Sequence, residues 1–245
     1  MESEVKLVMF DMSGTTVKDK NEVLDCFLIS AERTGLSTDA SEINSMMGMS
    51  KIEVFTQLWT NQLPNASQDV LESKIKNSFQ LFQEILERWY QENTIEPVDG
   101  TLEVFKYLKE RNIKIALGTG FYHKVTQFIL SKLGWDQGLD SNGVGNRNTL
   151  LDFVISSDRV LKGRPYPYMI QAAMKVLKVY DSKEVIKIGD TPSDLMEGNN
   201  ANCLYTLGVC SGTHTKNELL IYPNDGIINS VKDLPKFMEQ KVLVR

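Results

Sequence analysis

The sequence has 245 residues, of which 42% are hydrophobic and 24% charged, as in ordinary globular proteins. This length allows one sizeable core, or a core with a smaller inserted domain. The net charge of −5 argues against nucleic-acid and anionic-membrane partners, which require clustered lysine and arginine. The initial apolar run is too short for a signal peptide, and no run approaches a membrane span. Three cysteines at unrelated spacings indicate neither a disulfide framework nor a zinc site, so we expect a cytoplasmic protein.

The first predicted element is a buried strand at residues 5–10 (VKLVMF), which ends at a Gly-Thr-Thr turn. The following segment, residues 20–96, has apolar residues at helical spacing, such as Val23, Phe27 and Ala31, and nothing in it predicts a strand. We interpret this segment as an all-helical cap inserted into an α/β core. The core then comprises residues 1–19 and 97–245.

Short β-prone runs continue after the cap, at residues 113–117, 153–156, 185–188 and 203–207. Helical patterns at residues 101–111 and 168–177 lie among them. Strands that alternate with helices of this length predict a parallel sheet covered on both faces. The expected fold class is therefore α/β, with a Rossmann-like, doubly wound parallel sheet and an inserted helical cap.

Polar residues follow the predicted strands. Asp11 follows the first strand, Thr119 the second and Asp190 the fourth, while Arg164 precedes the helix that begins near residue 168. Ligands of open parallel sheets bind beyond the carboxyl ends of the strands, so we expect these side chains to converge. Taken singly, each has a plainer interpretation, such as a helix cap, a turn residue or a surface cation.

Two carboxylates in close proximity repel each other, and a divalent cation removes that penalty. Oxygen ligands suit Mg²⁺, which also binds substrate phosphate. With Mg²⁺ in place, Asp11 would attack phosphorus as a nucleophile. Arg164, Thr119 and backbone N–H groups at glycine turns would hold the equatorial oxygens, and Asp194 would hold a metal-bound water.

Four motifs resemble those of the haloacid dehalogenase superfamily, specifically its phosphonatase branch: FDMSGTT, LGTG, GRPYPYM and IGDTPSDL. The resemblance covers essentially the whole chain. It implies that Asp11 is the nucleophile and that Mg²⁺ binds Asp11, the Ser13 carbonyl and Asp190, with Asp194 in support. It also implies substrate contacts from four further residues: Thr15, Gly120, Met47 and Gly48.

Two departures from the general superfamily pattern are shared with its phosphonatase-like members. Ser13 replaces the usual acid that protonates an alkoxide leaving group, and Arg164 replaces the usual lysine. A serine cannot act as a general acid near neutral pH. This favours a carbon leaving group, as in cleavage of a C–P bond.

The predicted cap contains a further match. Residues 47–52 (MGMSKI) resemble the phosphonatase loop whose lysine, here Lys51, forms a Schiff base with phosphonoacetaldehyde. Such a lysine must be partly neutral. However, Val54 stands where true phosphonatases have a histidine, and the adjacent Glu53 favours a charged Lys51. The alternative is that Lys51 is a solvated lysine at a helix start, or a phosphate anchor.

The leading hypothesis is a magnesium-dependent hydrolase of a small phosphonate or phosphate ester that works through an aspartyl-phosphate. A phosphomonoesterase similar to phosphoglycolate phosphatase is the main alternative, and borohydride trapping on Lys51 separates the two. A metal-independent dehalogenase and a non-catalytic binding protein are further alternatives, which metal-independent chloride release or ligand binding without turnover would support. The resemblance also allows a homodimer through cap helices.

Overall fold

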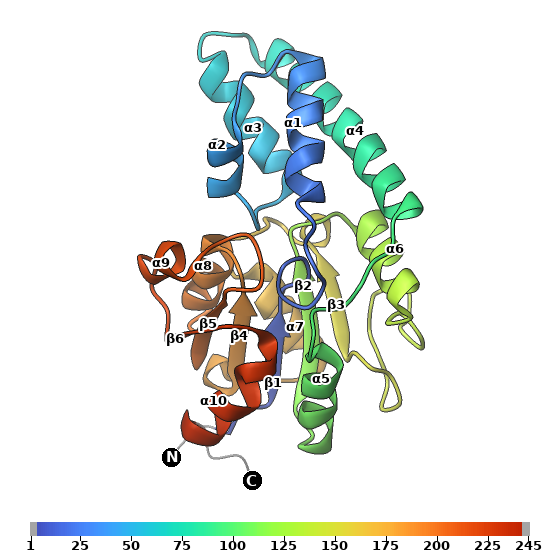
Figure 1. Ribbon diagram of the computed structural model, residues 1–245, viewed down its shortest axis with the longest axis vertical. Coiled ribbons are helices and arrows are strands. Elements are labelled where there is room, and N and C mark those ends of the chain that lie inside the picture. Colours follow the sequence, from blue (N-terminus) through green and yellow to red (C-terminus); the bar gives the residue numbers. More distant parts are fainter. Residues whose placement is uncertain (1–3, 242–245) are drawn as a thin grey trace.

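The computed structural model describes residues 4–241. Its centre is a sheet of six parallel strands in the order β3-β2-β1-β4-β5-β6 (Figure 1). This is the doubly wound order, in which the chain leaves β1 toward one edge and later returns to build the other edge. The strands are β1 (Leu7–Phe10), β2 (Lys114–Thr119), β3 (Phe153–Ser156), β4 (Val185–Gly189), β5 (Tyr205–Val209) and β6 (Gly226–Ile228).

Helices cover both faces of the sheet, because alternate residues of the central strands are buried on opposite sides. Leu7 and Met9 of β1 face a cluster that includes α7, whereas Val8 and Phe10 face a larger cluster that includes α5. The helices of the core are α5 (Thr101–Glu110), α6 (His123–Leu133), α7 (Tyr168–Leu177), α8 (Pro192–Asn200), α9 (Lys216–Leu220) and α10 (Leu234–Lys241). Short 3₁₀ turns occur at Ser157–Arg159, Ser182–Glu184 and Val231–Asp233.

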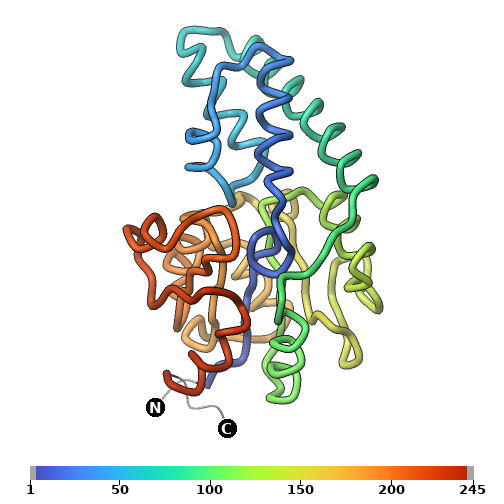
Figure 2. The backbone as a smooth tube through the Cα atoms, in the orientation of Figure 1, coloured from blue at the N-terminus to red at the C-terminus, as the bar shows by residue number. Residues whose placement is uncertain are grey.

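Four helices between β1 and α5 stand beyond one end of the sheet (Figures 1 and 2). They are α1 (Glu22–Thr34), α2 (Ala40–Ser45), α3 (Lys51–Gln62) and α4 (Gln68–Glu92). The rings of Phe27, Phe55 and Phe82 pack together among α1, α3 and α4, with centroids 4.4–5.7 Å apart. This insertion therefore has apolar packing of its own.

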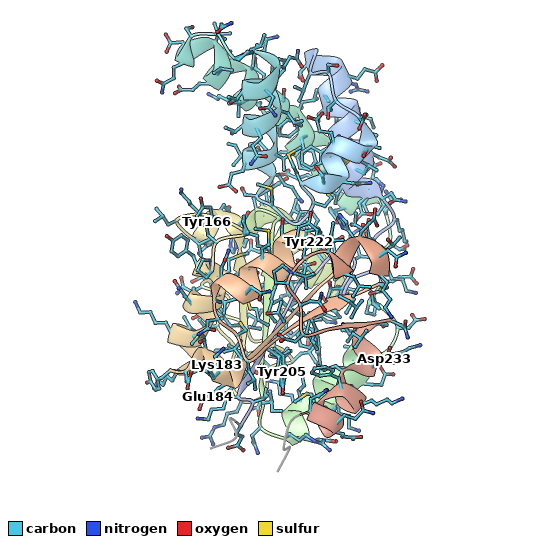
Figure 3. The ribbon with its side chains drawn as sticks, turned by 90° about the vertical axis from the view of Figure 1, so that its left-hand side faces the viewer. Tyr166, Lys183, Glu184, Tyr205, Tyr222 and Asp233 are labelled. Carbon is cyan, nitrogen blue, oxygen red and sulfur yellow. The ribbon has the colours of Figure 1, made fainter. Side chains whose placement is uncertain are left out.

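The chain enters and leaves the insertion through two neighbouring segments. The Lys18 N–H donates to the Glu96 carbonyl at 2.9 Å, and the Val98 N–H donates to the Thr16 carbonyl at 2.9 Å. We propose these paired segments as the boundary between cap and core. In Figure 3, Tyr166 and Tyr222 lie on the part of the core nearest the insertion, whereas Lys183 and Glu184 lie toward the opposite end of the strands.

The architecture confirms the predicted fold class, including the helical insertion. All five predicted strands are present, displaced by at most a few residues. The sequence analysis missed β6 and the helices α2, α6, α9 and α10, of which β6, α2 and α9 are short. No helix among the described residues is long and apolar enough to cross a membrane.

Candidate active site

The predicted acids meet at the carboxyl ends of the central strands. Asp11 directly follows β1, Asp190 directly follows the neighbouring β4, and Asp194 lies in the first turn of α8. One carboxylate oxygen from each of the three lies within 4.8 Å of the others. The topology of the sheet therefore gathers three buried acids from widely separated parts of the sequence.

Asp190 is held from several sides. Its Oδ1 accepts a hydrogen bond from the Thr15 hydroxyl at 3.0 Å, and its Oδ2 accepts one from the Thr213 N–H at 2.8 Å. Gly14 and Gly212 flank it so closely that a Cβ at either position would lie 2.4 or 2.1 Å from Oδ2. Burial, together with the nearby charges of Asp11 and Asp194, raises the pKa of Asp190 well above its usual range.

Asp11 is paired with Arg164, which is fully buried. The Arg164 Nη1 donates to Asp11 Oδ1 at 2.6 Å, and Oδ2 accepts no hydrogen bond from residues 4–241. Burial raises the pKa of the Asp11 carboxyl to about 6, although the Arg164 charge opposes this increase. At neutral pH Asp11 is therefore mostly ionised, and one of its oxygens remains available.

Asp194 serves two local functions. With Thr191 it forms the capping box of α8, in which the Thr191 hydroxyl donates to Asp194 Oδ2 at 2.6 Å. Its Oδ1 lies 3.2 Å from Arg164 Nη1 and 2.8 Å from Lys187 Nζ. Burial would raise the pKa of Asp194, but these two cations outweigh it and hold the pKa below its ordinary value.

Eight of the predicted site residues line one cavity of about 30 Å³ between the insertion and the sheet. They are Asp11, Ser13, Met47, Gly48, Lys51, Thr119, Gly120 and Arg164. The other three, Asp190, Asp194 and Thr15, lie beside the cavity. Thr15 was predicted to contact substrate, but its hydroxyl is fully buried and directed at Asp190.

The insertion lies directly on the core at this cavity. A Cβ on Gly120 would lie only 2.6 Å from the carbonyl oxygens of Gly48 and Met49. A Cβ on Gly48, where φ is +83°, would lie 2.2 Å from the Thr191 hydroxyl oxygen. Glycines at both positions therefore allow the loop before α3 to close the cavity.

Lys51 is the first residue of α3 rather than part of the preceding loop, and it is only 6% exposed. Its ammonium lies 5.4 Å from the ring centre of Phe121 and 5.8 Å from that of Phe27. Burial lowers the pKa of Lys51 to about 8, although the Asp11 charge acts in the opposite direction. The interpretation of Lys51 as a solvated lysine is therefore wrong.

The sequence analysis missed two charged residues that are fully buried beside Arg164. Glu197 Oε2 lies 2.9 Å from Arg164 Nε, and Lys187 Nζ lies 2.9 Å from the same Glu197 oxygen. The lysine inside the apolar run VIKI could have indicated a buried charge. A parallel strand covered on both faces leaves no solvated side for such a lysine. Asp19 and Phe121, which also line the cavity, carried no comparable signal.

A doubly wound sheet with three acids at its carboxyl edge, closed by a helical insertion, defines a capped α/β protein with a buried anionic site. The model of a family described as haloacid dehalogenase-like hydrolase matches residues 5–202. The chain belongs to this family and is a hydrolase of the phosphatase or phosphonatase type.

Known proteins support this assignment. A phosphonoacetaldehyde hydrolase of Bacillus cereus is 32% identical over 219 residues, which cover 86% of this chain and 77% of that protein. A hydrolase from Pseudomonas syringae has a similar structure, with a TM-score of 0.78, 18% identity and coverage of 98% and 99% of the two chains. A phosphonoacetaldehyde hydrolase like protein from Oleispira antarctica has a TM-score of 0.76, 21% identity and coverage of 98% and 93%. The two structures indicate the shared fold.

Proposed function

We propose that this protein hydrolyses a small phosphonate or phosphate monoester in a magnesium-dependent reaction, with Asp11 as the nucleophile. The observation that carries this proposal is the position of Asp11 in the closed cavity. Arg164 holds one of its oxygens at 2.6 Å, and Lys51 lines the same cavity. A carboxylate that is ionised, oriented and shielded from water is suited to attack phosphorus.

The acid cluster fits Mg²⁺. Three buried carboxylates with oxygens within 4.8 Å of one another offer hard oxygen ligands, and burial together with their mutual repulsion raises the pKa of Asp190. We assign the site to Asp11, Asp190 and the backbone carbonyl of Ser13. Asp194 supports it from behind, because its oxygens already contact Thr191, Arg164 and Lys187. When bound, Mg²⁺ would neutralise charge on the transferring phosphoryl group.

In the first step, Asp11 Oδ2 would form a bond to phosphorus while the bond to the leaving group breaks, which leaves an aspartyl-phosphate. The Arg164 guanidinium and the backbone N–H groups near Thr119 and Gly120 would hold the phosphoryl oxygens. Water would then hydrolyse the aspartyl-phosphate, releasing phosphate and restoring the Asp11 carboxylate. The closed loop at Gly48 would exclude other water during transfer.

The leaving group distinguishes phosphonate from phosphate ester. Ser13 supplies no acid for an alkoxide, whereas Lys51 is a buried amine with its pKa lowered to about 8. An amine of this kind can condense with an aldehyde to form an imine and water. When the C–P bond breaks, its electron pair would pass into the protonated imine and give an enamine, so no carbanion forms. Protonation of the enamine carbon and hydrolysis by water would then release the aldehyde and restore the Lys51 amine. We therefore favour a phosphonate with an aldehyde group, the substrate class named for the Bacillus cereus relative.

Val54 favours a second candidate. It is 1% exposed and apolar, so the position three residues after Lys51 provides no proton shuttle for imine chemistry. In that case Lys51 would act only as a cation for substrate charge, and the protein would be a phosphomonoesterase. Dehalogenation and binding without catalysis have no comparable support among the described residues.

Phosphate release in the presence and absence of Mg²⁺ tests the proposal, with phosphonoacetaldehyde and a panel of small phosphate monoesters. We expect magnesium-dependent turnover of at least one compound, and a loss of at least about 10³-fold in kcat for Asp11→Asn. Equal turnover by Asp11→Asn, or none of any compound by the wild type with Mg²⁺, would contradict the proposal.

Borohydride separates the two leaving-group mechanisms. Reduction in the presence of phosphonoacetaldehyde should attach a two-carbon or phosphonoethyl adduct to Lys51, which peptide mass spectrometry would locate. The Lys51→Arg variant should give no adduct there. An unmodified Lys51 in an enzyme that releases phosphate from monoesters would support the phosphomonoesterase.

A further inference from the structure

Lys187 occupies a core position of the sheet. Its register partner on β1 is Met9, which belongs to the apolar cluster that includes α7, and Lys187 itself is fully buried. A buried ammonium is costly unless charged partners surround it. Lys187 has two such partners on α8, since Nζ lies 2.8 Å from Asp194 Oδ1 and 2.9 Å from Glu197 Oε2.

Arg164 completes these contacts into a closed ring of ion pairs. Arg164 Nη1 lies 3.2 Å from Asp194 Oδ1, and Arg164 Nε lies 2.9 Å from Glu197 Oε2. The ring therefore runs from Arg164 to Asp194, Lys187, Glu197 and back to Arg164. All four side chains are fully buried, and their charges sum to zero. Charge balance makes the burial of four ions tolerable, whereas the loss of one partner leaves an uncompensated charge.

Two glycines bring α8 close enough to form the ring. A Cβ on Gly198, within α8, would lie 2.9 Å from the Lys187 Cβ and 2.5 Å from the Thr206 hydroxyl oxygen. A Cβ on Gly189 would lie 2.1 Å from the Asp194 Cγ. Glycine inside a helix is destabilising relative to alanine. Gly198 therefore lowers the stability of α8 but allows this helix to pack closely against β4.

We infer that Lys187 and Glu197 are positioning residues, which fix the Arg164 guanidinium against the nucleophile; this inference rests on the proposed role of Asp11. The guanidinium is held on three edges. Nε contacts Glu197, Nη2 donates to the Gly118 carbonyl at 2.5 Å, and Nη1 reaches Asp11 at 2.6 Å. Neither Lys187 nor Glu197 lines the catalytic cavity, so both act through Arg164.

The charge of the ring explains why both residues are needed. Without Lys187, Asp194 and Glu197 would carry excess negative charge and draw Arg164 away from Asp11. Without the Glu197 charge, the Lys187 ammonium and the guanidinium would repel each other, and Nε would lose its charged acceptor. A displacement of about 1 Å at a reacting group can cost about 100-fold in rate.

The test compares Lys187→Met, Glu197→Gln and the double variant with the wild type. We expect each single variant to lower kcat about 100-fold with KM within about threefold, because orientation of Asp11 matters in the transition state. The double variant restores charge balance, so its kcat should be at least about tenfold higher than that of the less active single variant. Glu197→Gln changes the side chain least, because it exchanges one oxygen for an amide nitrogen. If Lys187→Met does not fold, the kcat of Glu197→Gln alone tests the inference.

A matched control lies at the other end of the sheet. The buried Asp152 carboxylate lies 2.7 Å from Lys109 Nζ and 3.0 Å from Lys114 Nζ. Asp152→Asn should lower Tm without changing kcat, since it disturbs a buried ion cluster remote from the cavity. If the ring variants likewise lower Tm and leave kcat within about threefold of the wild type, the ring is structural only and the inference is overturned.

A readout without turnover separates this inference from the proposed function. The Arg164 Nε–H is buried and hydrogen-bonded at 2.9 Å to Glu197, so it should give a slowly exchanging signal in ¹H–¹⁵N NMR spectra. We expect this signal to shift or broaden in both single variants and to stay unchanged in Asp152→Asn. An unchanged Arg164 signal in both single variants would overturn the inference even if the wild type hydrolysed substrate. If the protein turns over no substrate, the change in the Arg164 Nε–H signal still tests the inference.

Discussion

Lys51 illustrates how burial changes the pKa of a single residue at the expense of stability. As the first residue of α3 it lies at the positive end of the helix dipole, and the rings of Phe27 and Phe121 replace water around its ammonium. Burial lowers its pKa to about 8, so an appreciable fraction is neutral just above physiological pH. Sequence proximity suggested a different influence, from Glu53, but the strongest charges acting on the pKa of Lys51 come from Asp11 and Arg164.

Lys51→Met should raise the free energy of unfolding at pH 7 by up to about 3 kcal/mol, because the wild type must bury an ammonium. The folded pKa of about 8 lies below the ordinary 10.5, so the unfolded state binds more protons between these values. Wild-type stability relative to the variant should therefore rise as pH increases from 8 to 10.5. Urea unfolding of both proteins between pH 7 and pH 10.5 measures this difference.

Lys106→Met is the control for this prediction, because the Lys106 side chain is 80% exposed. It should change stability little at any pH. A stability difference between Lys51→Met and the wild type that stays constant across the range would show that Lys51 titrates normally in the folded protein.

At the scale of elements, the contact between the loop before α3 and the end of β2 determines whether the cavity is closed. Gly120 follows the last residue of β2, and Gly48 belongs to the insertion. Gly120 has no room for a side chain because the Gly48 and Met49 carbonyl oxygens approach it, and Gly48 has none because the Thr191 hydroxyl does. Motif similarity indicated that both residues contact substrate, but the structure gives them a further role, in letting the insertion close on the core.

Gly120→Ala should therefore impair closure without unfolding the protein. Its Cβ would lie 2.6 Å from two carbonyl oxygens of the insertion, so the loop must move away. We expect kcat/KM to fall by about 10- to 100-fold, because water enters and the substrate loses its orientation. Steady-state kinetics measure the fall, and Tm should change by only a few degrees.

Gly226→Ala provides the matched control, since its Cβ would make only ordinary contacts of 3.4 Å or more. It should retain wild-type kinetics. Wild-type kcat/KM in Gly120→Ala would show that the insertion need not close as tightly for turnover as the structure shows.

At the scale of the whole molecule, folding brings like charges together, so the stability of the fold depends on how far these charges are neutralised. Asp11, Asp190 and Asp194 come from three separate segments, and their carboxylate oxygens lie within 4.8 Å of one another. Arg164 and Lys187 balance part of this charge, but among residues 4–241 neither forms an ion pair with Asp190. A divalent cation that binds only the folded state would relieve the remaining repulsion.

Mg²⁺ should accordingly raise Tm, by the equivalent of about 2.7 kcal/mol at 100 times its Kd. Asp190→Asn should lose most of this increase, because an amide is a weaker ligand and carries no charge. Differential scanning calorimetry in EDTA and in excess Mg²⁺ measures the effect. Asp152→Asn, far from the acids, should respond to Mg²⁺ as the wild type does, and an equal response of Asp190→Asn would contradict the assigned site.

The sequence by itself determined the layout of this protein. Apolar runs of strand length and amphipathic stretches of helical length follow local periodicity, so the parallel sheet, the helical insertion and the polar residues after each strand could be predicted. The positions of Asp11 and Asp190 directly after strands then predicted that they lie together, because residues at the carboxyl ends of neighbouring parallel strands must share one edge. Motif similarity added Arg164, which precedes a helix.

Tertiary structure alone decided which of these residues touch, and how. The ring through Lys187 and Glu197 depends on the neighbouring position of β1 and β4 and on the close approach of α8 at Gly198. The lowered pKa of Lys51 depends on rings contributed by α1 and by the end of β2. Contacts between distant segments, and the loss of water around them, are properties of the packed chain, so no local pattern in the sequence encodes them.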